Sequence, residues 1–389
     1  MKNTMKRILA IIQFLISVNL FLSCSGGGGG SVTPYDYHSP EEVLSFLDEV
    51  KLNYPSITAL ESVGYSTDGR PVRAIVISDN PGTFEGEPAI RLTGGIHGDE
   101  KVTVELLIRF IEYLAGNYGR DSAVTDLVNS RYIVIIPVLN PDGLAAGTRY
   151  NSNSVDLNRN FTAFSEVETL AMKSFSESNI FHLSVTFHAG AVLVNMPFDY
   201  AEESVDAPDE NDLVKAYAKS YSSAGTFLDN PDLYQSIYMD QGTINGGNWY
   251  VITGSLLDWS YLQTGCLDFT VEVSKRKSPG TEDEVEQVFM YNRDSLMAYI
   301  AKAGCGVYGR VTDSSGIPIA GVSVSAAYND GSGITGDLVT KTDSQGYYHR
   351  ILLPGNYTLT FVKNGYTSED SGVTVDDNSA GQENNIVMN

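Results

Sequence analysis

The sequence is poor in cysteine. Cys24, Cys266 and Cys305 are the three cysteines among 389 residues, and three are too few for a disulfide scaffold. The sequence leaves open whether Cys266 and Cys305 pair with each other. A hydrophobic core must therefore hold the fold together. The hydrophobic fraction of 42% and the chain length suffice for two or three domains.

Cations are also scarce. The chain has 25 Lys and Arg against 48 Asp and Glu, which gives a formal net charge of −23. Such a surface repels the phosphates of nucleic acids and anionic lipid headgroups, so we expect no nucleic-acid partner. A diffuse acidic surface also keeps a protein soluble, and it therefore does not identify a substrate.

No apolar run at the N-terminus is long enough to cross a bilayer. The apolar segment Ile8–Leu22 has 15 residues, whereas a membrane-spanning helix needs about 20. Because a basic start precedes this segment, it predicts an export signal over residues 1–23. The cysteine and glycine run that follow resemble a bacterial lipoprotein signal, which implies lipid attachment at Cys24 and a flexible tether over 24–33.

This resemblance implies a localisation. We expect an exported lipoprotein of the bacterial cell envelope, on its periplasmic or its surface face, that contacts the membrane only through the lipid anchor. Cleavage of an ordinary export signal, followed by free secretion, is the alternative. The signal and the tether occupy most of the residues before the next domain, so we expect no folded inhibitory pro-domain.

Alternating strand and helix patterns follow the tether. Ser39 is the expected N-cap of a helix that begins at Pro40. Short apolar runs predict strands over 72–78, 89–94, 132–139 and 183–189, and helical spacing predicts helices over 102–117 and 166–178. Such alternation indicates an α/β domain with a mixed, mostly parallel sheet flanked by helices, which we assign to residues 34–302.

The pattern changes after Gly306. Segments such as "GVYGRVTD", "GVSVSAAY" and "NYTLTFVK" alternate or are β-rich, and turn signals separate them. No helical pattern of useful length remains. Residues 306–389 are therefore predicted to form a small all-β sandwich.

Six separated motifs occur in one order along the α/β domain. They are "HGDE", "PVLNPDGL", "TRYNSNSVDLNRNF", "VTFHAGAVLVNMPFDY", "GNWY" and "LLDWSYLQTGCLDFTVEVS". Together these resemble the zinc metallocarboxypeptidases of the carboxypeptidase A-like superfamily, and most closely the branch that contains carboxypeptidases N, E, M and D. In that branch a transthyretin-like module follows the catalytic domain, and residues 306–389 resemble that module.

The resemblance implies a metal site with one Zn²⁺. It assigns His97, Glu100 and His188 as ligands, and two histidines with one glutamate form a known catalytic zinc set. Both histidines follow short apolar runs, so we expect them at strand ends, where ligands gather in open α/β sheets. Asp156 matches an aspartate that orients the first histidine and raises its basicity.

The resemblance also implies roles for five further residues. Glu272 matches the general base and acid that takes a proton from water at the metal and passes it to the leaving amine. Arg149 matches the arginine that stabilises the developing oxyanion. Asn158 and Arg159 match the pair that clamps the free carboxylate of the substrate. Tyr250 matches the mobile tyrosine that closes over the bound C-terminal residue.

Two residues bear on specificity, and they indicate different preferences for the C-terminal residue of the substrate. Asp199 matches the aspartate with which the basic-specific branch pairs a C-terminal Lys or Arg. Leu257 stands where that branch usually has Gln, and an apolar residue there suits Leu or Phe. The expected preference leans slightly to Lys or Arg.

The expected function is removal of one residue from peptides that have a free C-terminal carboxylate. One alternative keeps the chemistry and changes the substrate to peptidoglycan stem peptides. An alternative of another class is a catalytically silent protein that binds peptides or glycans. The oligomeric state is not determined by the sequence.

Overall fold

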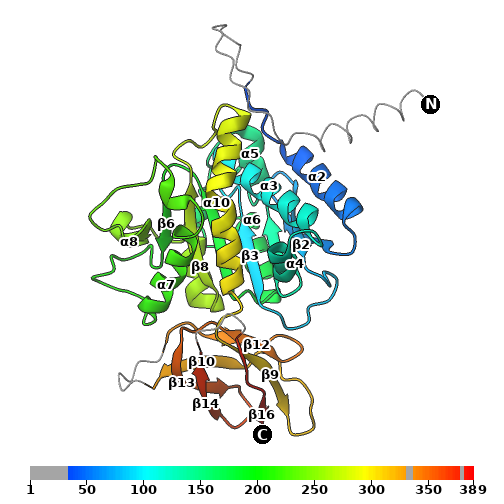
Figure 1. The fold of residues 1–389 in the computed structure, drawn as a ribbon, viewed down its shortest axis with the longest axis vertical. Coiled ribbons are helices and arrows are strands. Elements are labelled where there is room, and N and C mark those ends of the chain that lie inside the picture. The colour runs from blue at the N-terminus through cyan, green and yellow to red at the C-terminus, as the bar shows by residue number, and fades with distance from the viewer. Residues whose placement is uncertain (1–33, 330–335, 377–380) are drawn as a thin grey trace, which may run out of the picture. The chain divides into compact units, whose positions relative to one another are not determined.

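The computed structural model describes residues 34–329, 336–376 and 381–389. Residues 35–389 form one compact unit, in which an α/β module precedes a β-sandwich (Figure 1). The predicted export signal, Cys24 and the glycine tether lie outside the described residues. Within the described ranges, no helix combines the length and the hydropathy needed to cross a bilayer.

The α/β module contains helices of very different lengths. The α-helices are α2 (Pro40–Asn53), α3 (Val102–Asn117), α4 (Ser122–Val128), α5 (Pro141–Ala146), α6 (Val167–Ser178), α7 (Asn211–Ser222), α8 (Gly246–Trp249), α9 (Leu256–Trp259) and α10 (Glu282–Lys302). Two 3₁₀ turns, η1 (Leu157–Arg159) and η2 (Phe227–Asp229), and one π turn, η3 (Ser260–Thr264), complete the helical elements of the described chain.

The strands divide between the two modules. In the α/β module they are β1 (Thr58–Tyr65), β2 (Pro71–Ile77), β3 (Ala89–Thr93), β4 (Tyr132–Ile136), β5 (Leu183–His188), β6 (Val192–Met196), β7 (Thr243–Asn245) and β8 (Leu267–Val273). In the sandwich they are β9 (Val307–Asp313), β10 (Ser323–Tyr328), β11 (Thr340–Lys341), β12 (Tyr347–Arg350), β13 (Gly355–Val362), β14 (Glu369–Val375), β15 (Gln382–Glu383) and β16 (Ile386–Met388).

The first module is built on one mixed, eight-stranded sheet. Its order is β1-β2-β4-β3-β5-β8-β6-β7, and the central pairs β4–β3, β3–β5 and β5–β8 are parallel. The pairs β1–β2, β2–β4 and β6–β8 are antiparallel. The predicted mixed sheet with a parallel centre is confirmed.

The predicted elements agree with the structure apart from their ends. Ser39 and Glu42 form a reciprocal capping box at α2, which begins at Pro40 as predicted. Strand β4 ends at Ile136 rather than at 139. The reason is Pro137, which has no N–H to continue the ladder.

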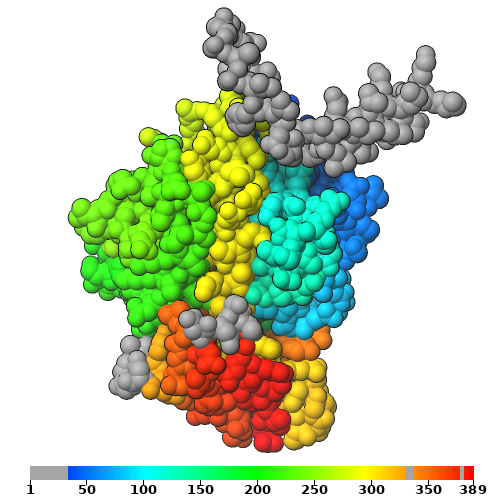
Figure 2. Space-filling model, in the orientation of Figure 1, coloured from blue at the N-terminus to red at the C-terminus, as the bar shows by residue number. Residues whose placement is uncertain are grey.

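The central strands are buried on both faces. All five residues of β4 and all six of β5 are buried, which explains their uninterrupted apolar sequences. Helices α3, α7 and α10 contribute Phe110, Val214 and Leu296 to the large core on one face. Figure 2 shows α10, in yellow, filling the surface between the segments coloured green and cyan.

The second module is a sandwich of two small sheets, as predicted. One has the order β11-β10-β13-β14, and the other the order β12-β9-β15 with β16 beside β9. Val307, Val324, Leu359 and Phe361 lie in its own apolar core.

Side-chain contacts join the two modules. Arg350 of the sandwich forms a buried ion pair with Glu210, the residue before α7. The hydroxyl of Tyr261 donates to Asp337 Oδ1 at 2.7 Å. These two contacts tie the sandwich to the α/β module.

Candidate metal centre and substrate cleft

Neighbouring strands bring the predicted metal ligands together. His188 is the last residue of β5, and His97 follows the end of β3 by four residues. Because β3 and β5 are parallel neighbours, their carboxyl ends meet at the same edge of the sheet. Glu100 lies in the turn before α3. A Cβ at Gly98 would lie 1.9 Å from the carbonyl carbon of Gly143, so this turn needs glycine between its two ligands.

The three side chains form a closed triangle of donor atoms. His97 Nδ1 lies 3.1 Å from Glu100 Oε1, His188 Nδ1 lies 3.1 Å from Glu100 Oε2, and the two Nδ1 atoms are 3.1 Å apart. All three side chains are buried. Donor atoms of a tetrahedral zinc site with bonds of about 2.0–2.1 Å lie about 3.3 Å apart. The geometry therefore fits one zinc ion, and within the described residues this is the only cluster of at least three such ligands.

Asp156 fixes the tautomer of His97. Its Oδ1 lies 3.0 Å from His97 Nε2, so Nε2 carries the proton and Nδ1 keeps its lone pair for a metal. Burial opposes the charge of Asp156. The hydrogen bonds and charges of His97 and Arg149 nevertheless hold the pKa of this carboxyl well below its usual range. The role that the resemblance implies for Asp156, orienting the first ligand histidine, stays a prediction.

Glu272 lies beside the triangle on the adjacent strand. It is the register partner of His188 in the parallel pair β5–β8. Its Oε2 is buried, and no hydrogen-bond partner for it lies in the described part of the chain. Burial, with the nearby charge of Glu100, raises the pKa of Glu272 to about 8. A carboxyl with this pKa both accepts and donates a proton near neutral pH.

Two arginines face the same cleft. Arg149 Nε donates to Asp156 Oδ2 at 2.9 Å, and its guanidinium also lies 3.5 Å from Glu100. Arg159 follows in η1, where its Nη1 donates to the carbonyl of Asn158. The side chain of Asn158 accepts from the backbone N–H of Leu256 at 3.0 Å, which ties η1 to α9.

Tyr250 lies at the mouth of the cleft. It follows α8 directly and is 47% exposed, whereas the ligands beneath it are buried. Its ring packs edge-on against Trp249, with 4.7 Å between centroids. That Tyr250 closes over a bound residue stays a prediction of the resemblance.

Of the two residues predicted to set specificity, Asp199 lines the cleft and Leu257 does not. Asp199 is buried and lines the cleft, and its Oδ1 accepts from Asn195 Nδ2 at 2.8 Å. Gly246 makes room for it, because a Cβ there would lie 2.0 Å from Asp199 Oδ1. Leu257 is 1% exposed in α9 and is not among the lining residues.

Sequence reasoning missed several lining residues. These are Asn195, Gly246, Trp249, Ile252 and Thr270. Thr270 has a signal in hindsight, since it lies two residues before Glu272 and points to the same face of β8. The others depend on how segments far apart in sequence fold together.

The sequence left open whether Cys266 and Cys305 pair with each other. In the structure, both are free thiols.

Comparisons with known proteins identify the family of each module. Residues 43–300 match the family model described as "Zinc carboxypeptidase", and residues 306–389 match "Carboxypeptidase regulatory-like domain". Carboxypeptidase D of Mus musculus is 36% identical over 383 residues, which cover 91% of this chain and 27% of that protein. The chain thus spans about a quarter of the length of that relative.

In two further comparisons, the match covers most of the length of the other protein. Carboxypeptidase M of Mus musculus is 33% identical over 366 residues, which cover 88% of this chain and 81% of that protein. The crystal structure of carboxypeptidase A from Helicoverpa armigera superimposes with a TM-score of 0.58 at 21% identity, over 69% of this chain and 73% of that chain. The structural likeness establishes the fold, and the family match over residues 43–300 establishes descent. The chain belongs to the zinc carboxypeptidase family.

Proposed function

We propose that this chain is a zinc-dependent carboxypeptidase that hydrolyses the last peptide bond of substrates with a free C-terminal carboxylate. One observation carries the proposal. Glu272, with a buried oxygen that has no partner in the described chain, lies beside a triangle of three zinc-type donors. A silent binding protein has no need for a proton acceptor at this position.

When bound, zinc supplies a Lewis acid that polarises the scissile carbonyl and lowers the pKa of a water molecule. His97, Glu100 and His188 would hold one ion. Glu272 would take the proton from the attacking water and give it to the leaving amine, and its raised pKa suits both steps.

The cationic side chains have separate roles in the proposal. Arg149, anchored to Asp156, would donate to the oxygen that gains negative charge at the scissile carbonyl. Arg159, with Asn158, would bind the C-terminal carboxylate of the substrate through a two-pronged contact. Tyr250 would close over the bound residue and exclude water.

The preferred C-terminal residue is proposed to be Lys or Arg. Asp199 is a buried carboxyl that lines the cleft, and burial raises its pKa while the nearby charge of Arg159 opposes this rise. The cation of a C-terminal Lys or Arg would favour the charged form of this carboxyl and pair with it. Leu257, which favoured an apolar preference in the sequence, does not line the cleft.

The test is kcat/KM of the zinc-loaded protein on two peptides that differ only in a C-terminal Lys or Leu. Glu272→Gln serves as the blank. Faster cleavage of the Lys peptide supports the proposal in full, and faster cleavage of the Leu peptide removes Asp199 from specificity. Cleavage of peptidoglycan stem peptides alone would favour the amidase alternative, and cleavage of neither would favour a binding protein.

We also propose the domain boundaries and the localisation that the sequence predicts. The catalytic domain spans residues 34–302 and the sandwich 306–389, while residues 1–23 direct export and Cys24 carries lipid. The support for lipid attachment is the basic and apolar start followed by Cys24 and glycines. Metabolic labelling with radioactive palmitate tests it, because Cys24→Ala would remove the label if the cysteine is the attachment site.

A further inference from the structure

A second cavity lies at the junction of the two modules. It has a volume of about 660 Å³, within the range of small-molecule sites. Ala89 at the start of β3, Tyr132 at the start of β4 and Phe181 just before β5 line its inner side. Of the proposed metal ligands, His188 is the last residue of β5 and His97 follows the last residue of β3, so both lie at the opposite ends of these strands. The cavity is therefore separated from the catalytic cleft by the length of the parallel strands.

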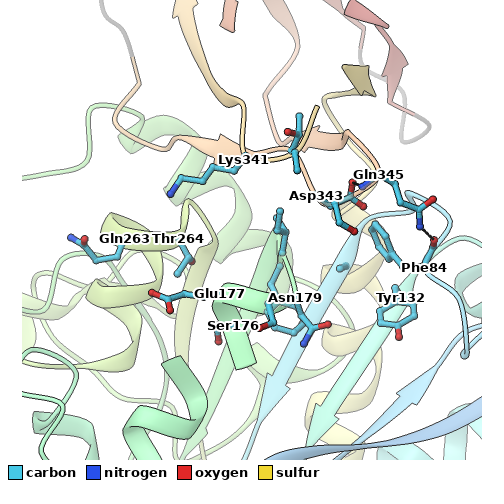
Figure 3. Close-up of a pocket in the computed structure, with 18 residues that line it drawn as sticks. Phe84, Tyr132, Ser176, Glu177, Asn179, Gln263, Thr264, Lys341, Asp343 and Gln345 are labelled. Atoms are coloured by element: carbon cyan, nitrogen blue, oxygen red, sulfur yellow. Dashed lines mark hydrogen bonds between the residues drawn. The ribbon is translucent and has the colours of Figure 1, made fainter. Parts of the chain in front are cut away.

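The cavity combines an apolar floor with a polar rim. Tyr132 and Phe181 are buried, and Phe84 packs edge-on against Tyr132 with 5.5 Å between ring centroids. The rim consists mainly of amide and hydroxyl side chains from both modules. Figure 3 shows Lys341 and Gln263 at one end of the cavity and Phe84 at the other. This division is the usual one in ligand sites, where apolar walls supply contact area and a few polar groups set orientation.

Fixed contacts hold the two walls in place. Gln345 Nε2 of the sandwich donates to the carbonyl of Phe84 at 3.4 Å (Figure 3). Asp343 Oδ1 accepts from the backbone N–H groups of Gln345 and Tyr347, both at 2.8 Å. The buried ion pair of Arg350 with Glu210 lies at the same junction. The cavity is thus preformed, which reduces the entropy that a ligand must lose on binding.

Several rim groups have hydrogen-bonding capacity that the protein does not use. The exposed side chains of Gln263, Ser344 and Lys341 line the cavity, and within the described residues they form no hydrogen bond with the protein. Asn179 donates its Nδ2 to Phe175 O and keeps its carbonyl oxygen for another partner. A ligand could satisfy all of these groups at once.

The chemistry of these groups selects the ligand. Amides and hydroxyls both donate and accept, as do the hydroxyls of a sugar. The charged side chains in the lining are those of Lys341, Glu177 and Asp343, and together they carry a net charge of −1. So small a charge suits neither a polyanion nor a polycation. Aromatic side chains in the floor suit the apolar C–H faces of sugar rings. We propose that this cavity is a binding site for a neutral oligosaccharide.

Saturation-transfer NMR tests the proposal on the zinc-loaded full chain. The probes are linear trisaccharides of glucose, N-acetylglucosamine, galactose and mannose, together with a C-terminally amidated tripeptide, which lacks the free carboxylate that the catalytic cleft needs. We expect transfer to at least one trisaccharide. Gln263→Ala and Phe84→Ala should each weaken its binding by about tenfold.

A matched control is Gln287→Ala, which removes an exposed amide from α10 outside the cavity and should leave the signal unchanged. Peptidase activity should stay at the wild-type level in all three variants, which shows that each folds and separates this proposal from the catalytic one. No transfer to any trisaccharide would overturn the proposal, as would transfer that survives both cavity variants. Transfer to the amidated tripeptide alone, lost in Gln263→Ala, would replace it with a peptide site.

Discussion

Glu272 and His188 are register partners on adjacent parallel strands. The sheet, rather than a loop, therefore sets the separation between the proposed base and a proposed metal ligand. Strand positions are more rigid than loop positions, and catalysis depends on placement to within fractions of an ångström.

Glu272→Gln should abolish most peptide hydrolysis. The amide keeps the shape of the side chain but cannot take a proton, so kcat should fall by roughly 10²- to 10⁴-fold. Steady-state kinetics on a Lys-terminated peptide measure the loss, and zinc content by elemental analysis is the control, which should not change. Full activity in this variant would remove Glu272 from the mechanism.

Asp156→Asn should weaken zinc binding without unfolding the protein. The neutral amide no longer raises the basicity of His97, and loss of such a partner typically costs about 10- to 100-fold in metal affinity. Competition with a chromophoric chelator measures the Kd for zinc. An unchanged Kd would mean that the 3.0 Å contact with His97 does not tune the ligand.

Asp199→Asn should reduce the preference for C-terminal Lys over Leu. Removing a charged hydrogen-bond acceptor costs on the order of 10- to 100-fold in the ratio of the two kcat/KM values. Leu257→Ile is the matched comparison, since Leu257 is buried outside the cleft lining, and it should leave the ratio nearly unchanged. A ratio that responds to residue 257 and not to Asp199 would contradict the proposed specificity.

Asp258 should make the protein less stable as the pH rises. Burial, and then the charge of Asp199, raise the pKa of Asp258 to about 8 in the folded state, whereas an unfolded Asp titrates near pH 3.9. Between these values the native state binds more protons than the unfolded state, so the free energy of unfolding falls with increasing pH. Asp258→Asn keeps an acceptor for the N–H of Asp199 and should flatten this dependence.

Urea unfolding of the wild type and of Asp258→Asn at pH 5 and pH 8 measures the difference. Comparing the two proteins cancels the titration of groups that they share. Equal pH slopes in the two proteins would show that the Asp258 carboxyl titrates in the folded state as it does in the unfolded chain.

Loss of the ion pair between Glu210 and Arg350, which joins the two modules, should lower the free energy of unfolding. Arg350→Met leaves the Glu210 carboxylate buried without its partner, which typically costs about 3–5 kcal/mol. Adding Glu210→Gln should recover part of this loss, because the two residues are coupled. Urea unfolding of both single variants and the double variant completes the cycle, and additive losses would show that the pair does not interact.

The sequence predicted two modules, and the resemblance to the family proposed His97, Glu100 and His188 as zinc ligands, which the structure brings together. Uninterrupted apolar runs such as that of β4 arise because a strand buried on both faces has no polar side. The strand-end histidines and the capping box at Ser39 follow from local rules, in which a few neighbouring residues decide the outcome. The order of the motifs was enough to identify the resemblance to the family.

Which side chains share the cleft depends on long-range packing, which a local sequence pattern does not reveal. Leu257 and Asp258 are neighbours in sequence, yet Leu257 packs into the core and Asp258 accepts the N–H of Asp199. Asn195 and Gly246 line the cleft because segments that are distant in sequence meet there. No short sequence motif predicts this position for either residue. The cavity at the junction depends on the docking of two modules. Long-range packing fixes such contacts, and it depends on which distant residues become neighbours rather than on local sequence.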